Sequence, residues 1–132
     1  MSVYVTWDDL GHNVLRYEFT PPWTWNEFTA ASELVQTMIT ETPHEVFVIM
    51  DVRTVGAIPP GSMTYVTRPA QAMPANTVAV FVVGANAVIQ TLFGVFRALY
   101  GPIAENVMLC DTFAEAYAVI AERQTAAVRA LC

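Results

Sequence analysis

Three continuous apolar runs constrain the fold of this chain more than any other feature. The first, Val46 to Met50, is followed at once by the acid Asp51 and by a bend rich in Pro and Gly. The second extends from Thr77 to Val83, and the third from Asn106 to Cys110. An unbroken apolar run is typical of a parallel strand that is covered on both faces, because a strand with one wet face alternates in polarity. The sequence therefore predicts an α/β fold with central parallel strands.

The N-terminal segment predicts a β-hairpin. Two β-rich segments, Val3 to Trp7 and Val14 to Phe19, alternate in polarity, and the residues between them include Asp, Gly and Asn, which favour a turn. Side chains on one strand face are expected to alternate. The expected core side chains are Leu15, Tyr17 and Phe19, and the expected outward ones are Val14, Arg16 and Glu18.

Two capping boxes predict helix starts. Thr24 to Glu27 forms the first, with Trp23 and Phe28 placed as a hydrophobic staple, and Thr42-Pro43 should end the helix. Its expected buried face is Trp25, Phe28, Ser32, Val35 and Ile39. Thr112 to Glu115 forms the second box and opens a C-terminal helix. The expected inward residues of that helix are Phe113, Ala116, Tyr117, Ile120, Ala127 and Leu131.

Two further helices are expected between the apolar runs. Ser62 is expected to cap a short helix of about two turns, which Pro69 should stop or kink. Gly84 should turn the chain into a helix from about Ala85 to Tyr100, and Gly101-Pro102 should end it. The whole chain, 1–132, is then a single α/β sandwich domain. Its mixed five-stranded sheet has an N-terminal hairpin and about four helices, in the order β-β-α-β-α-β-α-β-α.

Composition disfavours several classes of partner. The formal net charge is −6, with six Arg and no Lys, so nothing resembles the basic surface that binds nucleic acid or anionic lipid. No apolar run is long enough to span a bilayer, and the N-terminus lacks the pattern of a signal peptide, which predicts a cytoplasmic protein. The 55% apolar content is high for a soluble domain and favours self-association.

No metal, cofactor or catalytic site is predicted. Cys110 and Cys132 have no neighbouring Cys or His at the spacing of metal ligands and are expected to be one buried and one terminal thiol. His12 and His44 are expected at the surface without a partner that could orient a general base. A nucleophile also needs a placed base, so we expect no enzyme.

From about Val3 to Gln124 the chain resembles the STAS-like domains, and more closely their SpoIIAA-like relatives, which are compared with CRAL-TRIO domains. The residues that carry the resemblance are Trp25-Asn26-Glu27-Phe28, Val48-Ile49-Met50-Asp51, Val80-Phe81-Val82-Val83-Gly84 and Thr112-Phe113-Ala114-Glu115-Ala116. The resemblance implies a non-enzymatic interaction or regulatory module of the anti-sigma-factor antagonist type. The relation to CRAL-TRIO domains implies an alternative function, the binding of a small apolar ligand or lipid tail.

The bend after Asp51 holds the candidate polar site. Regulatory STAS domains carry a phosphorylated serine in an Asp-Ser-Ser-Gly loop, whereas this chain reads Pro59-Pro60-Gly61-Ser62. Ser62, or less favourably Thr64, is the candidate for modification, and simple helix capping is the alternative for Ser62. Asp51 and Arg53 flank the bend and either orient a polar ligand or pair with each other.

The helix from Ala85 to Tyr100 is apolar on two faces. One row, Val88, Leu92, Val95, Phe96 and Leu99, is expected to face the sheet. Ile89, Phe93 and Tyr100 form a second row, with Arg97 beside it. We expect this second row to form a homodimer contact. Packing within the subunit is one alternative, and an apolar pocket lined by Phe93, Phe96 and Tyr65 is another.

Overall fold

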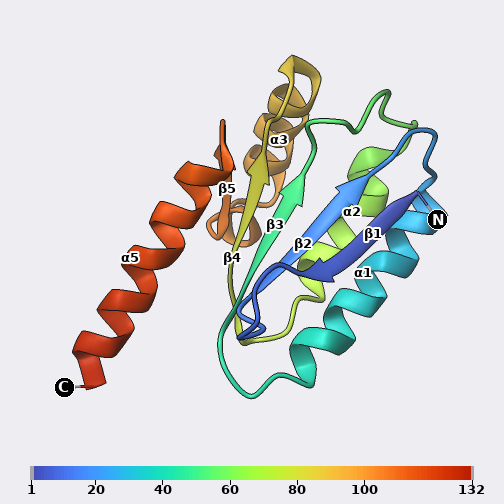
Figure 1. Cartoon of the computed structure of the whole chain (residues 1–132). Helices are drawn as coiled ribbons and strands as arrows, with labels where there is room; N and C mark the ends of the chain where they lie inside the picture. Colours follow the sequence, from blue (N-terminus) through green and yellow to red (C-terminus); the bar gives the residue numbers. More distant parts are fainter. Residues whose placement is uncertain (1, 132) are drawn as a thin grey trace.

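The computed structural model describes residues 2–131, apart from the side chains at positions 127, 128, 130 and 131. Its five-stranded sheet is formed by β1 (Val3–Trp7), β2 (Val14–Phe19), β3 (Val46–Asp51), β4 (Thr77–Val83) and β5 (Val107–Cys110). The strands lie side by side in chain order (Figure 1). β1 runs antiparallel to β2, and the remaining neighbours are parallel. The predicted mixed sheet with an N-terminal hairpin is therefore confirmed.

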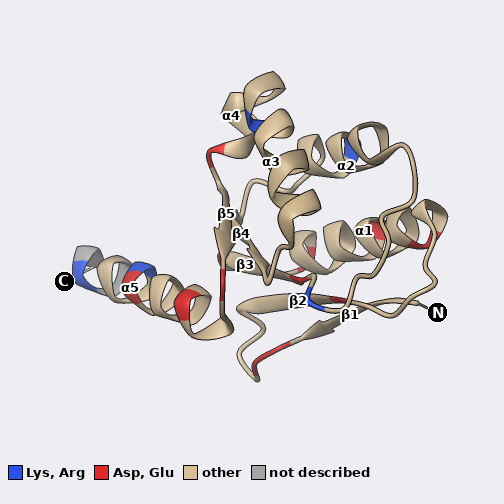
Figure 2. Cartoon of the chain, turned by 90° about the horizontal axis from the view of Figure 1, so that it is seen from above, with Lys and Arg blue, Asp and Glu red and all other residues tan. Residues whose placement is uncertain are grey.

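Five helices lie within the described residues: α1 (Trp25–Thr40), α2 (Ser62–Gln71), α3 (Ala87–Leu99), α4 (Gly101–Ala104) and α5 (Phe113–Leu131). The first four cover one face of the sheet, whereas α5 lies on the other face and extends past the sheet (Figures 1 and 2). The prediction of about four helices missed α4. Gly101-Pro102 ends α3 as expected, but Pro102 also favours the first turn of a new helix.

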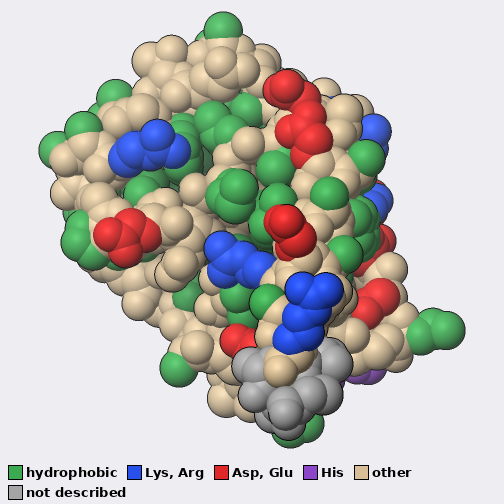
Figure 3. All heavy atoms as spheres, turned by 90° about the vertical axis from the view of Figure 1, so that its left-hand side faces the viewer, with side chains coloured by type: hydrophobic (Ala, Val, Ile, Leu, Met, Phe, Trp, Pro, Cys, Tyr) green, Lys and Arg blue, Asp and Glu red, His purple; other side chains and the backbone are tan. Residues whose placement is uncertain are grey.

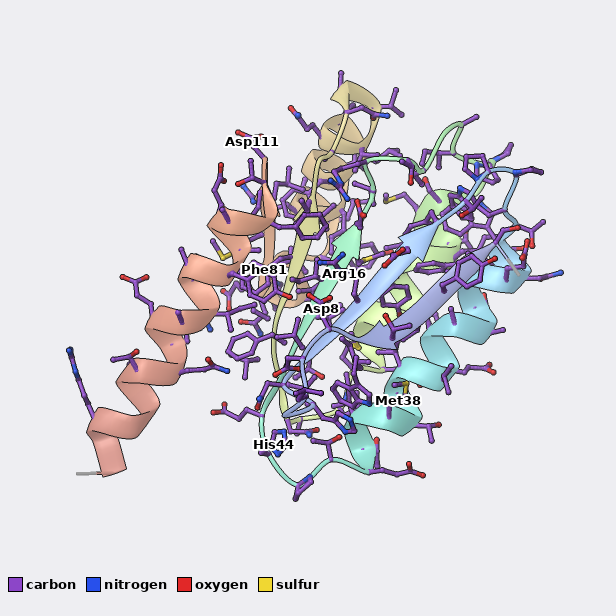
Figure 4. The ribbon with its side chains drawn as sticks, in the orientation of Figure 1. Asp8, Arg16, Met38, His44, Phe81 and Asp111 are labelled. Atoms are coloured by element: carbon purple, nitrogen blue, oxygen red, sulfur yellow. The ribbon has the colours of Figure 1, made fainter. Side chains whose placement is uncertain are left out.

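The side chains of each strand divide between two cores. Val46 and Val48 of β3 pack toward α1, whereas Phe47 and Ile49 pack toward α5. Phe81 of β4 belongs to the α5 side and lies between its strand and that helix (Figure 4). Both faces of β3 are thus apolar, which is why its sequence does not alternate.

The first capping box forms as predicted and sets the position of α1. The Thr24 hydroxyl accepts from the Glu27 backbone N–H at 3.2 Å, and the Glu27 carboxylate accepts from the Thr24 backbone N–H at 3.2 Å. The predicted inward face is also confirmed, with Ala31 as an additional buried residue. This helix is therefore fixed by local signals that the sequence shows openly.

The prediction that Val14 of β2 points outward is wrong, because Val14 is only 3% exposed. Val14 packs in the core beneath α5, so the second face of this strand is partly covered. Arg16 is also partly covered: its guanidinium lies 4.2 Å from the centre of the Phe113 ring and pairs with Asp8 at 3.1 Å (Figure 4). Glu18 is exposed, as predicted.

The predicted cap of α2 is wrong, and Pro69 does not stop the helix. Gly61, with φ of 95°, is the N-cap, and Ser62 is the first helical residue with no side-chain capping bond in the described structure. Glycine is favoured here because a side chain would strain this left-handed conformation. Pro69 lies inside the helix, which continues to Gln71, so proline removes one backbone donor without ending the helix.

Helix α5 leaves the sheet after its first half. Its predicted inward residues Ala116 and Ile120 are buried, and Phe113 and Tyr117 are half-buried. Residues 121–126 are all exposed, and the predicted side chains of Ala127 and Leu131 lie outside the described part. No helix among the described residues has both the length and the hydrophobicity to cross a membrane.

Candidate functional site

A cavity of about 470 Å³ lies between the sheet and the helices α1, α2 and α3. The sheet side of the wall includes Val48, Val80 and Val82, and the helix side includes Val66 and Phe93. Small-molecule sites in proteins usually have volumes of about 300 to 1,000 Å³ and mostly apolar walls. The size and composition of this cavity therefore match a binding site for a small molecule.

The cavity exists because α2 and α3 do not pack closely onto the sheet. All residues of α2 are described, and none of them is buried. In α3, the buried residue is Phe96. Apart from Phe96, their inward apolar side chains are only half-buried and line the cavity. Protein interiors normally close such gaps, because unfilled space forfeits dispersion contacts.

Two tryptophans hold one end of the cavity together. Trp23 Nε1 donates to the carbonyl of Val55 at 2.7 Å, and Trp25 Nε1 donates to Pro59 and Pro60 carbonyls at 3.0 and 2.9 Å. These bonds tie the loop between β3 and α2 to the start of α1. This loop leads directly into α2.

Tyr65 supports this end from outside. Its ring stacks on the Trp25 ring, with centroids 5.5 Å apart and planes within 3°. Tyr65 is 40% exposed and does not belong to the cavity wall, so the prediction that it lines a pocket is wrong. The predicted pocket residues Phe93 and Phe96 do line the cavity, as does Ile89.

The cavity opens at the amino-terminal ends of β4 and β5. Its exposed lining residues are Gln71 at the end of α2, Ala75 before β4, Pro102 in α4 and Asn106 before β5. The lining residues at the opposite end, such as Trp23, are buried. The mouth therefore lies between the end of α2 and the segment around α4.

The wall of the cavity carries no Asp, Glu, Lys, Arg or His among the residues that the structure describes. Its few polar groups include the Tyr17 hydroxyl, which is bonded to Ser32 Oγ at 3.0 Å. Burial raises the pKa of Tyr17 to about 12, although the bond to Ser32 acts in the opposite direction. Tyr17 is therefore neutral at physiological pH, and the wall as a whole is uncharged.

Thr77 supplies a polar atom without a protein partner. Its hydroxyl oxygen is buried and makes no hydrogen bond to any described residue. Thr77 begins β4 and lines the cavity at the same end as the mouth. A buried hydroxyl without a partner destabilises a protein, and this oxygen is covered by neighbouring atoms rather than exposed to the cavity.

Asp51 and Arg53 pair with each other on the opposite face of the sheet. Arg53 Nε and Nη2 lie 2.9 and 3.0 Å from the two Asp51 carboxylate oxygens, and the Arg53 backbone N–H also donates to Asp51 at 3.1 Å. Burial raises the pKa of Asp51, but the hydrogen bonds from Arg53 outweigh it, so the net pKa is lowered. The Arg53 guanidinium also lies 4.5 Å from the centre of the Phe113 ring. Of the two alternatives for Asp51 and Arg53, the structure therefore shows the pairing of the two side chains with each other.

The four candidate residues of the bend therefore do not form one site. Asp51 is 6% exposed and lies on the α5 side, whereas Ser62 and Thr64 belong to α2 on the other side. Ser62 is half-buried and lines the cavity, and Thr64 is exposed. Alternation along β3 puts Asp51 on the α5 face, whereas α2 covers the other face.

The inward face of α3 combines residues from both predicted rows: Leu92 and Phe96 of the first row line the cavity, as do Ile89 and Phe93 of the second. Val88, Val95 and Leu99, expected on the sheet, are 57%, 43% and 63% exposed. Ile89 and Phe93 face inward, and Phe96 is in contact with Tyr100, with ring centroids 5.6 Å apart. Burying the larger aromatic side chains removes more apolar area from water, which favours the observed orientation.

Arg97 stays at the surface of α3. Its guanidinium lies 4.6 Å from the centre of the Phe93 ring, and the residue is exposed. On the face at the β5 edge, acidic and basic side chains are interspersed, and hydrophobic side chains lie between them (Figure 3). No large surface of one sign is visible on that face.

The histidines are exposed as predicted, but they are neighbours. His44 Nε2 lies 3.0 Å from the backbone carbonyl of His12, and the His12 ring stacks on Trp7 at 4.5 Å. Cys110 is buried as predicted, and burial, aided by Glu115 and Asp111, raises its pKa. Among the described residues, no group of three His, Cys, Asp or Glu side chains is placed to hold a metal ion.

Sequence reasoning missed Thr77 and the mouth residues Gln71 and Asn106. Thr77 was assigned only to a buried strand, and nothing in its neighbours marks its hydroxyl as unpaired. The one available signal was the excess of apolar residues on α3, which led to the pocket residues Phe93 and Phe96 but not to the position of the opening.

Comparison of the chain with protein-family models, with curated proteins and with solved structures found no significant match. The resemblance to STAS-like domains thus stays a prediction from residue patterns, and function has to be argued from the site itself.

Proposed function

We propose that the chain binds a small apolar molecule in the cavity between the sheet and helices α2 and α3. The observation that carries this proposal is a volume of about 470 Å³ enclosed by an uncharged, largely apolar wall. A ligand there would remove apolar surface from water on both partners, which contributes about 25 cal/mol per Å². Binding is thus the alternative function implied by the resemblance, now favoured over the interaction module.

The volume gives the approximate size of the ligand. An apolar cavity of about 150 Å³ accepts one benzene molecule, so about 470 Å³ has room for roughly three rings, or about 18 non-hydrogen atoms. At about 0.3 kcal/mol per atom, such a ligand would gain about 5 kcal/mol, which corresponds to a Kd of about 0.1 mM. Tighter binding follows if the ligand fits the wall better.

Fluorescence with the neutral probe 1-N-phenylnaphthylamine tests the proposal. The probe has roughly the size estimated above, and its emission rises in apolar surroundings. We expect saturable binding with a Kd of about 0.1 mM or tighter. Native mass spectrometry of the purified protein should also reveal any co-purified apolar molecule.

Two variants that replace an alanine by tryptophan locate the bound probe. Ala70 of α2 lines the cavity, whereas Ala98 of α3 is exposed. Ala70→Trp should occupy the cavity and weaken binding at least about tenfold, since the indole competes for the same volume. Ala98→Trp should leave the affinity unchanged. Absence of saturable binding by the wild-type protein, or equal binding by both variants, would contradict the proposal.

A second candidate function is association with another copy of the chain. The exposed row Val88, Val95 and Leu99 follows one side of α3 and lies about 100° around the helix from the inward row. We propose a second copy as the occupant because an uncharged row is self-complementary across a two-fold axis, whereas a charged row would repel itself. This surface replaces the predicted contact through Phe93, which lines the cavity.

Sedimentation velocity of the wild type and Leu99→Glu tests the association. Leu99 is 63% exposed, so the variant should remain folded while any dimer dissociates. Gln90→Glu is the matched control, because Gln90 is exposed on a different side of α3. A wild-type protein that stays monomeric at high concentration would rule out the association.

A further inference from the structure

The outer edge of β1 carries backbone groups that are not used in the sheet. β1 is the last strand of the sheet, and Figure 2 shows it at the margin with α1 on one side. The Thr20 N–H donates to the Ser2 carbonyl, and the Asp8 N–H donates to the Val14 carbonyl, both at 2.8 Å. Because bonding alternates along an antiparallel pair, every second residue of β1 directs its backbone N–H and C=O away from β2. These residues are Val3, Val5 and Trp7, whose N–H and C=O groups have no partner among the described residues.

This edge lacks the features by which proteins usually block further strand pairing. The five residues of β1 carry no charge, include no proline and pair with β2 in unbroken register. The other edge strand, β5, has only four residues and lies between the exposed acids Glu105 and Asp111. Charges, prolines, bulges and short length normally keep an edge strand from pairing with another chain. β1 is therefore the edge at which an added strand would pair.

Helix α1 provides an apolar surface beside this edge. The Glu27 carboxylate accepts from the Ser2 backbone N–H at 2.8 Å, which places that side of α1 next to the start of β1. Leu34 and then Met38 follow Glu27 at intervals of seven and four residues, so all three lie on one side of the helix. Leu34 is 46% exposed, and Met38 is half-buried against the core on the sheet side of α1 (Figure 4). A strand added to β1 would cover these two side chains.

We infer that the edge of β1 binds an extended peptide segment of another protein, which pairs with β1 and lengthens the sheet. The side chains of such a strand alternate, so apolar residues at every second position would lie over Leu34 and Met38. Acidic groups stand at both ends of the edge, with Glu27 at its start and Asp8 and Asp9 at its end, and the chain has a net charge of −6. A segment with apolar residues at alternate positions and basic residues at its ends therefore complements this surface.

A second copy of the chain fits the edge less well. Val5 and Trp7 of β1 already pack against the core beside α1, and Val3 is only 1% exposed. An antiparallel pair of two β1 strands would place both α1 helices on the same face of the joined sheet. The two helices would then compete for the space beside Leu34. A peptide that has no helix of its own leaves that space for its side chains.

Fluorescence anisotropy with a labelled peptide tests the inference. The probe is a short peptide with blocked ends in which valine and threonine alternate, with lysines at both ends. We expect saturable binding to the wild-type protein. The same peptide with glutamates in place of the lysines should bind about fivefold more weakly, because acidic groups flank the edge. A peptide with proline in place of its central valine should bind at least about fivefold more weakly, since proline lacks the backbone donor.

Two variants locate the bound peptide. Val5→Pro removes an N–H that faces away from β2, so the fold should persist while the affinity for the lysine-ended peptide falls at least about fivefold. Leu34→Glu places a charge beneath the apolar residues of the peptide and should also weaken binding at least about fivefold. Gln36→Glu, on the opposite side of α1, is the matched control and should leave the affinity unchanged. None of these three residues lines the cavity, so all three variants should bind 1-N-phenylnaphthylamine as the wild type does.

Three results would overturn the inference. The first is the absence of saturable binding between the lysine-ended peptide and the wild-type protein. The second is equal peptide affinity in Leu34→Glu and Gln36→Glu, a comparison that stands even if Val5→Pro does not fold. The third is a wild-type dimer that binds no peptide and that Val5→Pro converts to a monomer in sedimentation velocity, because the edge would then hold a second copy. Failure of 1-N-phenylnaphthylamine to bind would contradict only the proposed function of the cavity.

Discussion

Replacing Tyr17 by Phe should reverse the order of stability between variant and wild type at high pH. Burial raises the pKa of Tyr17 from 10.0 to about 12 in the folded protein, against the opposing effect of its bond to Ser32. A group whose folded pKa is raised stabilises the fold fully below its unfolded pKa. That contribution is lost as the pH rises through 10 toward 12, because the unfolded chain releases the proton first.

The magnitude follows from the two pKa values. A difference of two pKa units corresponds to about 2.7 kcal/mol when fully developed, of which about 1.4 kcal/mol is already lost at pH 11. At pH 8 the variant should be less stable by about 1 to 2 kcal/mol, because Ser32 loses a buried hydrogen bond. The two stability curves should therefore cross near pH 11.

Urea unfolding followed by far-ultraviolet circular dichroism between pH 8 and 11.5 measures both curves. Groups that titrate equally in both proteins cancel in the difference, so the difference isolates Tyr17. Tyr4→Phe is a suitable control, since Tyr4 is 46% exposed on β1. Parallel curves for Tyr17→Phe and the wild type across this range would refute the assignment of Tyr17 as a buried neutral phenol.

Two further predictions concern the connections around the cavity. Asn76 Nδ2 lies 3.0 to 3.1 Å from three backbone carbonyls at the end of α1 and the entrance of β3, so Asn76→Ala should lower the free energy of unfolding by about 1 to 3 kcal/mol. The exposed Asn26→Ala is its control, expected within about 0.5 kcal/mol of the wild type in the same urea titration, and equal effects would contradict the role of Asn76. Gly84 has φ of 80° and a new Cβ there would collide with Arg53, so Gly84→Ala should lower the melting temperature and cost about 1 to 3 kcal/mol. Gly94→Ala in the middle of α3 meets no described atom and should instead stabilise by about 0.5 to 1 kcal/mol; the same sign for both glycines would refute this contrast.

Much of the fold follows from local patterns in the sequence. The bounds of β1, β2 and β4 agree with the predicted ones, because alternation and apolar runs report directly on whether one or both faces are buried. The start of α1 follows from its capping box, whose two hydrogen bonds join residues only three apart. These features need no knowledge of distant parts of the chain.

The errors fall where a choice depends on distant residues. Both apolar rows of α3 have helical spacing, so the sequence alone could not determine that the inward face combines Leu92 and Phe96 of one row with Ile89 and Phe93 of the other. The start of α2 depends on Gly61, which has a left-handed φ and follows the loop that Trp23 and Trp25 bind. Val14 is buried only because α5 folds back over that strand.

Almost all of the candidate site depends on tertiary packing and could not be predicted from the sequence. The sequence placed Asp51 and Ser62 in one bend, but strand alternation puts the Asp51 carboxylate under α5 and leaves Ser62 on the cavity side. The uncharged wall depends on how α2 and α3 stand over the sheet. The sequence by itself determined the strands, the helix caps and the surplus of apolar side chains. Only packing decided that part of this surplus encloses a cavity, because the distance between layers is set by contacts among residues far apart in the chain.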